Sequence, residues 1–415
     1  MRVVLSTYGS RGDVQPLAAL AVRLREAGVR ATVCAPPDEE FARRLAVAGV
    51  EMVPVGESVR SLVTGPPPQP GDFPKRVAAL VEQFHAAVGA LAGPGDTVVG
   101  TGLFPAIAGA QAAAERVGAR FVYAALQPNA LPSPHHPPLE YPMHPFPPGV
   151  TDPRELWELN VGVMNALFAE PVNGFRTSVG LAAVDNVRDH VFTERPWLAT
   201  DAVLGPWVQP AELAVVQTGA WLLADERPLP AELSAFLDAG QAPVYVGFGS
   251  MPLRGAPDAA EACARAGVAA ARAHGRRVVL ARGWAGLDRV DDRGDCLVVG
   301  EVNQQALFAR CAAVVHHGGA GTTTAAAAAG APQVVAPQIA DQPYWARRVA
   351  ELGIGAVHDG PAPSTDTLTA ALARALDGAV RERAADVRGR IRTDGAAVAA
   401  RLLIDGQGRR AGGEG

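Results

Sequence analysis

The sequence predicts an α/β protein of two domains, each built on a parallel sheet that helices cover. Two series of short apolar strands alternate with stretches of helical periodicity, one series in each half of the 415-residue chain. This alternation is the pattern that produces a parallel sheet with helices on its faces. The length exceeds what one hydrophobic core usually serves, which also favours two domains.

The two series lie on either side of a proline-punctuated stretch. Strands of the first series are predicted at residues 3–6, 31–35, 97–100 and 120–124. Strands of the second series are predicted at residues 243–249, 277–280, 296–299, 312–316, 333–337 and 353–357. In two such domains the carboxyl ends of the strands are expected to face each other across a cleft, which is the default ligand site.

The predicted boundaries follow from these series. We expect an N-terminal domain at 1–204, a linker at 205–229, a C-terminal domain at 230–405 and a disordered tail at 406–415. The last helix before the tail is a candidate for packing back on the N-terminal domain.

Composition indicates a globular protein that acts on small molecules. Charged residues make up 19% and hydrophobic residues 48%, a balance that supports a buried core. The net charge of −5 gives no electrostatic footprint for nucleic acid. Four separated cysteines show no spacing typical of a zinc site or a disulfide framework.

The sequence also carries expectations about location and assembly. The first residues reach Gly9 and several charges too soon for a signal peptide or a membrane span. We therefore expect a cytoplasmic protein without stable membrane association. A monomer or a weak dimer is expected.

The strongest local motif is the run HHGGAGTT at 316–323, which follows a predicted strand and opens a helix. Backbone N–H groups at a helix start, uncrowded by glycine, bind phosphate oxygens, and the helix dipole adds favourable potential. Thr322 and Thr323 are candidate hydroxyl donors. The alternative is a turn needed only for packing, with threonine as the helix N-cap. Adjacent residues of a strand point to opposite faces, so we assign His317 to the ligand and His316 to packing or an interdomain contact.

A second motif, GSRGDVQP at 9–16, joins a strand to a helical pattern that starts at Val14. Asp13 is a candidate general base for an acceptor hydroxyl, and the alternative is a purely structural N-cap. A helix N-terminus favours the ionised carboxylate, which makes it a weak base. Such a base suits a phenol better than an aliphatic alcohol.

The pair Asp341 and Gln342 lies just before a predicted helix. A carboxylate and an amide together can read several sugar hydroxyls, and the alternative is an N-cap followed by Pro343 at the first helical position. Ser250 and Trp284 are weaker candidates that are more often structural.

Two proline-rich stretches at 64–74 and 131–148 are predicted loops. Proline neither donates to a β-ladder nor continues a helix, and loops of this size are usually functional or disordered. The aromatic residues Tyr141 and Phe146 suit a lid or an acceptor contact, and Gln127 is a third candidate acceptor contact.

The order of these motifs resembles a known family. The sequence GSRGDVQP at the start, GFGS at 247–250, EVNQQALF at 301–308, HHGGAGTT and DQPYWARRV at 341–349 occur in sequence along the chain. The chain resembles family-1 glycosyltransferases of the GT-B fold and is most similar to the actinobacterial enzymes that decorate vancomycin-type glycopeptides. The likeness spans nearly the whole chain and implies two Rossmann-like domains, the first for the acceptor and the second for the nucleotide sugar.

The resemblance implies roles for individual residues. Asp13 would be the base. The donor would be bound by Ser10, Arg11, Gly12, Ser250, Arg282, Trp284, Val302, His317, Gly318, Gly319, Ala320, Gly321, Thr322, Asp341 and Gln342. Plant relatives carry a base-stacking tryptophan where this chain has Glu301, so Trp284 is the candidate replacement and Val302 offers backbone contacts.

The resemblance implies a single displacement with inversion, in which a TDP- or UDP-sugar donates to a small-molecule aglycone and no metal cofactor is required. The donor base and sugar and the acceptor remain open. The alternatives are a sterol or other lipid glucosyltransferase, a non-hydrolysing sugar-nucleotide epimerase, and a catalytically silent nucleotide-sugar-binding accessory protein.

Overall fold

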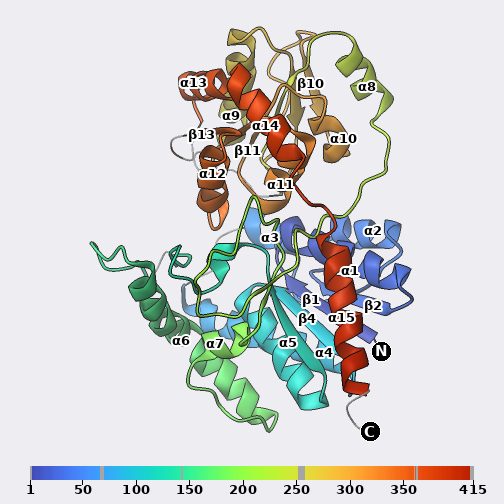
Figure 1. Ribbon diagram of the computed structural model, residues 1–415, viewed down its shortest axis with the longest axis vertical. Coiled ribbons are helices and arrows are strands. Elements are labelled where there is room, and N and C mark those ends of the chain that lie inside the picture. The colour runs from blue at the N-terminus through green and yellow to red at the C-terminus, as the bar shows by residue number, and fades with distance from the viewer. Residues whose placement is uncertain are drawn as a thin grey trace. The chain divides into compact units, whose positions relative to one another are not determined.

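The computed structural model describes residues 2–65, 70–141, 144–250, 258–358, 360 and 363–411. The chain divides into two compact units (Figure 1). Unit 1 comprises Met1–Thr200, Pro206–Leu223 and Thr393–Gly415, and unit 2 comprises Asp201–Gly205 and Ala224–Arg392.

Unit 1 contains a seven-stranded sheet in the order β3-β2-β1-β4-β5-β6-β7, and its paired strands are parallel. The strands are β1 (Arg2–Tyr8), β2 (Arg30–Ala35), β3 (Glu51–Pro54), β4 (Thr97–Gly102), β5 (Arg120–Ala125), β6 (Trp197–Leu198) and β7 (Val216–Gln217). The helices are α1 (Arg11–Glu26), α2 (Glu39–Val47), α3 (Val59–Thr64), α4 (Phe73–Leu91), α5 (Phe104–Val117), α6 (Pro153–Ser178), α7 (Val187–Phe192) and α15 (Gly395–Ala411), with 3₁₀ turns at Pro70–Asp72 and Pro128–Ala130.

Unit 2 contains a six-stranded parallel sheet in the order β10-β9-β8-β11-β12-β13. The strands are β8 (Val244–Gly247), β9 (Val278–Ala281), β10 (Cys296–Val299), β11 (Ala313–His316), β12 (Gln333–Val335) and β13 (Gly355–Val357). The helices are α8 (Ala231–Asp238), α9 (Ala259–Ala273), α10 (Gln304–Phe308), α11 (Ala320–Ala329), α12 (Gln342–Glu351), α13 (Thr365–Ala375) and α14 (Gly378–Arg388).

The strands of unit 2 are apolar on both faces because helices cover both sides of the sheet. In β8, Val244 and Val246 belong to one buried cluster together with residues of α9 and α13. Tyr245, between them, belongs to a second cluster with residues of α8, α10 and α11. Alternate side chains of a strand point to opposite faces, so β8 serves two cores and reads as a continuous apolar run.

The predicted α/β class and the two Rossmann-like sheets are confirmed. Each of the strands predicted in the two series overlaps a strand of the structure, and β3, β6 and β7 were not predicted. The predicted linker is wrong for residues 206–223, because these residues belong to unit 1 and contribute β7 to its sheet.

The last helix is part of unit 1. Helix α15 packs against α1, and Figure 1 shows its red ribbon beside the blue ribbon of α1. It continues to Ala411, so residues 406–411 are helical rather than the start of a disordered tail. Residues 412–415 of that expected tail, and residues 66–69 of the first proline-rich stretch, lie outside the described residues.

No helix within the described part of the chain combines the length and hydropathy that a membrane span requires.

Candidate functional site

Each sheet has a switch point, where the strand order reverses direction. In unit 2 this point lies between β8 and β11, and the last residue of β11, His316, pairs with Gly247 of β8. In open α/β sheets ligands bind outside the carboxyl ends of the strands at such a point. The loops that follow β8 and β11 therefore form the first candidate site.

The imidazole of His317 lies against two glycines of these loops. A Cβ on Gly249 would lie 2.8 Å from His317 Cε1, and a Cβ on Gly319 would lie 2.6 Å from His317 Nε2. Real Cβ atoms do not approach so closely, so the half-buried ring depends on both glycines. The loop after β8 and the start of α11 therefore hold His317 between them.

Helix α11 begins directly beside this ring. Its N-cap is Gly319, which has no side chain to form a capping bond, and the first amides of the helix belong to Ala320, Gly321 and Thr322. The first N–H groups of a helix have no intrahelical acceptor, and together with the helix dipole they favour an anion. The predicted phosphate loop is thus placed at a helix N-terminus.

The hydroxyl of Thr323, one of the two predicted donors, is used inside the helix. Thr323 is fully buried, and its hydroxyl donates to the Gly319 carbonyl at 3.0 Å. Thr323 therefore strengthens the first turn of α11 rather than presenting a donor, and of the two threonines only Thr322, which is half-buried, stays a candidate.

His316, beside His317 in the sequence, is fully buried and bonded on both ring nitrogens. Its Nε2 lies 2.9 Å from Gln333 Oε1, and its Nδ1 accepts the Gly318 N–H at 3.0 Å. Burial lowers the pKa of His316 to about 4, so the ring is neutral at physiological pH. The two histidines of the motif therefore occupy different environments, as strand alternation predicts.

Three more predicted segments meet this site. The Trp284 N–H donates to the Gly249 carbonyl at 3.0 Å, which joins the Arg282–Trp284 loop to the loop containing Ser250. On another side, a Cβ on Gly318 would lie 3.5 Å from Gln342 Cβ. The structure therefore brings the loops of Ser250, Trp284, His317 and Gln342 together within unit 2.

The Arg282 side chain already has an ion-pair partner. It is 57% exposed and forms an ion pair with Asp288 at 3.1 Å. An exposed pair of this kind contributes little to stability, so it leaves Arg282 able to exchange partners.

Asp341 and Gln342 have different environments at the start of α12. The half-buried Asp341 is the N-cap without a side-chain capping bond, and its Oδ2 accepts from Trp345 Nε1 at 2.6 Å. Burial raises the pKa of Asp341 to about 6, and the Trp345 hydrogen bond opposes that rise. Gln342 is buried, and its Oε1 accepts the N–H groups of Gln338 and Ile339 at 2.7 and 3.1 Å. The oxygen of Gln342 therefore orders the loop before α12.

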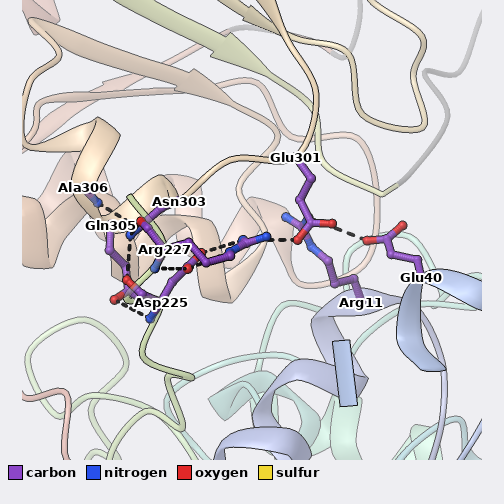
Figure 2. A network of polar contacts seen from close by, with 8 residues as sticks. All are labelled: Arg11, Glu40, Asp225, Arg227, Glu301, Asn303, Gln305 and Ala306. Atoms are coloured by element: carbon purple, nitrogen blue, oxygen red, sulfur yellow. Dashed lines mark hydrogen bonds and ion pairs between the residues drawn. The ribbon is translucent and has the colours of Figure 1, made fainter. Parts of the chain in front are cut away.

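The segment expected near the nucleotide base forms a polar network. Asn303 caps α10 by accepting the Ala306 N–H, and its Nδ2 donates to the carbonyls of Asp225 and Arg227. Arg227 forms a bidentate bond with the Asp225 carboxylate and lies 3.4 Å from Glu301 (Figure 2). Glu301 thus belongs to a charged cluster.

Val302 is half-buried and packs against the cluster that contains Leu307. Its side chain serves the core, so only its backbone is a candidate for a nucleotide contact.

In unit 1 the corresponding switch point lies between β1 and β4, where Tyr8 pairs with Gly102. Helix α1 begins at Arg11, three residues earlier than predicted, and its N-cap is Ser10 rather than Asp13. Asp13 is the third helical residue and closes a capping box, in which its Oδ2 accepts the Ser10 N–H at 2.8 Å. The predicted N-cap alternative for Asp13 is therefore wrong, although a structural role for its carboxylate is present.

Gly9 makes room for this carboxylate. A Cβ on Gly9 would lie only 2.2 Å from Asp13 Oδ2. The glycine and the Ser10 N–H together fix one oxygen of the half-buried carboxylate at the end of β1.

The neighbours of Asp13 also have local partners. Ser10 Oγ accepts the Gly12 N–H at 3.2 Å, and Arg11 lies 3.8 Å from Glu40 of α2 (Figure 2). The capping bond fixes the direction of the Ser10 hydroxyl oxygen, whereas Gly12 is exposed.

The three predicted acceptor contacts lie in unit 1 on the chain that follows β5. Gln127 is half-buried and precedes the 3₁₀ turn at Pro128–Ala130. Tyr141 packs edge-on to Phe168 at 6.2 Å, and burial raises the pKa of Tyr141 to about 12. Phe146 is half-buried, and its N–H donates to Glu140 Oε1.

The described part of the loop at 131–148 is held by hydrogen bonds within unit 1. His136 is buried, its Nε2 lies 3.1 Å from the Leu131 carbonyl, and its own carbonyl accepts from Trp157 Nε1 at 2.9 Å. Residues 142–143 of this loop lie outside the described residues. These bonds argue against the interpretation that the described part of the loop is disordered.

Sequence reasoning missed three contributors to the site. They are Gly249, which contacts the His317 ring, Asn303, which ties down the 225–227 segment, and Trp345, which binds Asp341. The spacing of four residues between Asp341 and Trp345 was a readable signal, since such residues are neighbours at a helix start. Among the described residues, His, Cys, Asp and Glu side chains form no group of three that could hold a metal ion.

Two family models match the chain. The N-terminal domain of glycosyltransferase family 28 matches residues 3–125. The C-terminal domain described as erythromycin biosynthesis protein CIII-like matches residues 288–399. The first match covers β1 to β5 of unit 1, and the second covers β10 to β13 of unit 2 and the start of α15.

Relatives from Amycolatopsis orientalis match nearly the whole chain. "Glycosyltransferase GtfE" is 51% identical over 97% of both chains. "Vancomycin aglycone glucosyltransferase" is 50% identical, with 99% of this chain and 98% of the relative covered. "dTDP-epi-vancosaminyltransferase" is 46% identical, with 98% and 97% covered.

Solved structures support the fold. The glycosyltransferase of kitacinnamycin has a TM-score of 0.70 at 23% identity, with 98% of both chains covered. The glycosyltransferase VinC has a TM-score of 0.66 at 21% identity, with 99% of this chain and 100% of that chain covered. At these identities the likeness concerns the fold alone. From its relatives and its two sheets, the chain belongs to the family-1 glycosyltransferases of the GT-B fold, together with the vancomycin-group enzymes.

Proposed function

We propose that this glycosyltransferase moves a sugar from a TDP- or UDP-sugar to a phenolic hydroxyl of a glycopeptide-type aglycone, with inversion at the anomeric carbon. The observation that carries the proposal is the His317 ring, held between Gly249 and Gly319 beside the N-terminus of α11. A helix N-terminus without a capping side chain offers N–H donors of the kind that bind phosphate groups, which supports the proposal. Two relatives add support, since one is named for the vancomycin aglycone and another for a dTDP-sugar.

In this proposal unit 2 binds the donor. The amides of Ala320, Gly321 and Thr322, together with His317, would contact the diphosphate. Negative charge grows on the diphosphate as the bond to the sugar breaks, so these donors stabilise the transition state more than the ground state. They would supply the charge stabilisation that a divalent cation supplies elsewhere, and no metal cofactor is proposed.

Asp341 and Gln342 would contact the donor sugar. The carbonyl oxygen of Gln342 already binds two loop amides, so its sugar contact is assigned to the amide nitrogen. Trp284 is the proposed partner of the nucleotide base, because its backbone ties it to the Gly249 loop.

In unit 1, Asp13 would be the general base and Gln127, Tyr141 and Phe146 the acceptor contacts. The Ser10 N–H fixes one carboxylate oxygen of Asp13 and so orients the group. The base would take the proton of the acceptor hydroxyl while the oxygen attacks the anomeric carbon. The nucleoside diphosphate would then leave from the opposite face, without a covalent enzyme intermediate.

Two substitutions test the two halves of this proposal. Asp13→Asn is expected to lower turnover by about 10²–10⁴ while nucleotide affinity stays within a few-fold, because asparagine retains an oxygen for the Ser10 N–H but cannot take a proton. His317→Ala is expected to weaken calorimetric binding of thymidine or uridine diphosphate by about tenfold or more. Near-normal turnover of the first variant removes Asp13 from its role, and unchanged affinity of the second removes His317.

The substrates are tested by mass spectrometry. Several nucleotide sugars are incubated with a panel of phenolic aglycones, and the product is the aglycone plus one sugar mass. Conversion of the donor without an acceptor would instead indicate an epimerase, and the absence of both products would indicate a binding protein without catalysis.

A further inference from the structure

His316 stands at the end of the central strand β11 of unit 2. It pairs with Gly247 of β8 on one side and Val335 of β12 on the other, and its side chain is fully buried. The residue precedes the turn that leads to α11. Its ring therefore lies under the proposed diphosphate loop, with no surface for a ligand.

The hydrogen bonds of His316 define one tautomer. The Gly318 N–H is a donor, so His316 Nδ1, at 3.0 Å, must carry a lone pair. The proton of the neutral ring is then on Nε2, which donates to Gln333 Oε1 at 2.9 Å. Gln333 is itself fully buried in β12. The ring thus connects a fixed side chain of the sheet to the backbone of the loop.

The bond to Gly318 acts at the bend of the turn. Gly318 has φ +92°, a conformation that favours glycine, and a Cβ there would lie 2.7 Å from Val335 Cγ1. The peptide plane that carries this N–H joins His317 to Gly318. An N–H fixed by His316 therefore fixes the backbone on the carboxyl side of His317, whose ring must fit between Gly249 and Gly319.

We infer that His316 is a positioning residue, which holds the Gly318 amide and thereby the His317–Gly319 turn in the conformation that receives a diphosphate. The inference rests on the proposed function of this loop and deepens it. It replaces the expectation that His316 serves packing or an interdomain contact. The neutral ring is required, since a proton on Nδ1 would oppose the Gly318 N–H.

Two amide substitutions separate the roles of the two ring nitrogens. In His316→Asn the side-chain oxygen is as many bonds from Cα as Nδ1, so it can accept the Gly318 N–H. In His316→Gln the amide reaches the place of Nε2, so it can meet Gln333 but not Gly318. Both variants remove the ring, and asparagine, which is one methylene shorter, leaves the larger gap in the core. Packing alone therefore predicts the weaker binding for His316→Asn, which is opposite to the result expected from the hydrogen bond.

Binding of thymidine diphosphate to the full chain is measured by calorimetry, alongside thermal unfolding. We expect His316→Asn to bind within about threefold of the wild type and His316→Gln to bind about tenfold or more weakly, at similar unfolding temperatures. Equal affinities for the two variants, or weaker binding by His316→Asn, would overturn the inference, because the hydrogen bond to Gly318 would then not decide binding. Failure of the wild type to bind thymidine or uridine diphosphate would overturn the proposed donor loop as a whole.

The tautomer gives a test that needs no variant. In ¹⁵N-labelled wild-type protein, long-range ¹H–¹⁵N spectra distinguish a protonated from an unprotonated ring nitrogen. We expect His316 to show an unprotonated Nδ1 and a protonated Nε2 at neutral pH. The opposite tautomer, or a charged ring, would overturn the inference while leaving the role of His317 intact.

Discussion

The ionised carboxylate of Asp341 destabilises the folded protein, and a single substitution should remove this effect. Burial raises its pKa to about 6 from an ordinary value of 3.8, although Trp345 donates to its Oδ2. At 1.36 kcal/mol per pKa unit, this difference makes ionisation of Asp341 cost the folded protein about 3 kcal/mol. Partial exposure of the side chain screens some of this cost, so Asp341→Asn is expected to stabilise the protein by about 1–3 kcal/mol at pH 7.5.

The sign of the pH dependence follows from linkage. Between pH 4 and pH 6 the folded protein holds a proton on Asp341 that the unfolded chain has released, so wild-type stability falls as pH rises through this window. Asparagine does not titrate and retains an oxygen for Trp345. The advantage of the variant should therefore be absent near pH 4 and complete above about pH 7.

Scanning calorimetry of the full chain from pH 4 to pH 8 measures this advantage. The matched control is Asp292→Asn, because the Asp292 side chain is fully exposed and its substitution should change stability by less than about 0.5 kcal/mol. A variant at Asp341 that is no more stable than wild type at pH 7.5, or an advantage that does not change with pH, would refute the reasoning. If Asp341 contacts the donor sugar as proposed, the stabilised variant should also lose activity.

Three further outcomes are expected. Gly319→Ala should weaken nucleoside-diphosphate binding by about tenfold, the value of one lost hydrogen bond, because the new Cβ would lie 2.6 Å from His317 Nε2 and displace the ring. Gly378→Ala, with open space around it, should leave binding unchanged, and equal calorimetric affinities of the two variants would contradict this. Gly9→Ala should lower turnover by displacing the Asp13 carboxylate, with which its Cβ would clash at 2.2 Å, and unchanged turnover would mean that the carboxylate position is unimportant. A chelator such as EDTA should leave turnover within about twofold, and a loss restored by added magnesium would show that α11 and His317 do not replace a metal.

The sequence predicted the parts of the fold that rest on long apolar patterns. The strands of both sheets that have several buried residues were identified, whereas β6 and β7, of two residues each, were not. Such short strands have too few residues to show a period, and their pairing depends on neighbours that lie far away in the chain. The same limit explains why the stretch 206–223 was assigned to a linker.

Residue identity predicted the helix start after β11 better than it predicted the contacts around it. The glycines and histidines of the motif after β11 predicted a helix start, and the structure places that helix start at a switch point, whereas anion binding there stays a prediction. The start of α1 was set three residues late because aspartate is a common N-cap, although Ser10 and Asp13 have the spacing of a capping box. The role of Gly249 could not be read, since it depends on where the His317 ring lies.

The position of α15 in unit 1 affects any attempt to build hybrid enzymes. The backbones of Gly219 and Gly395 pass so closely that a Cβ on Gly395 would lie 2.3 Å from the Gly219 carbonyl carbon, and α15 packs on α1. A chimera that exchanges only residues 1–204 for those of a relative would join a foreign α1 to a resident α15. Exchange of 206–223 and 393–411 along with the N-terminal part would keep these surfaces matched. For the same reason, unit 1 cannot complete its fold during synthesis until nearly the entire chain has been made.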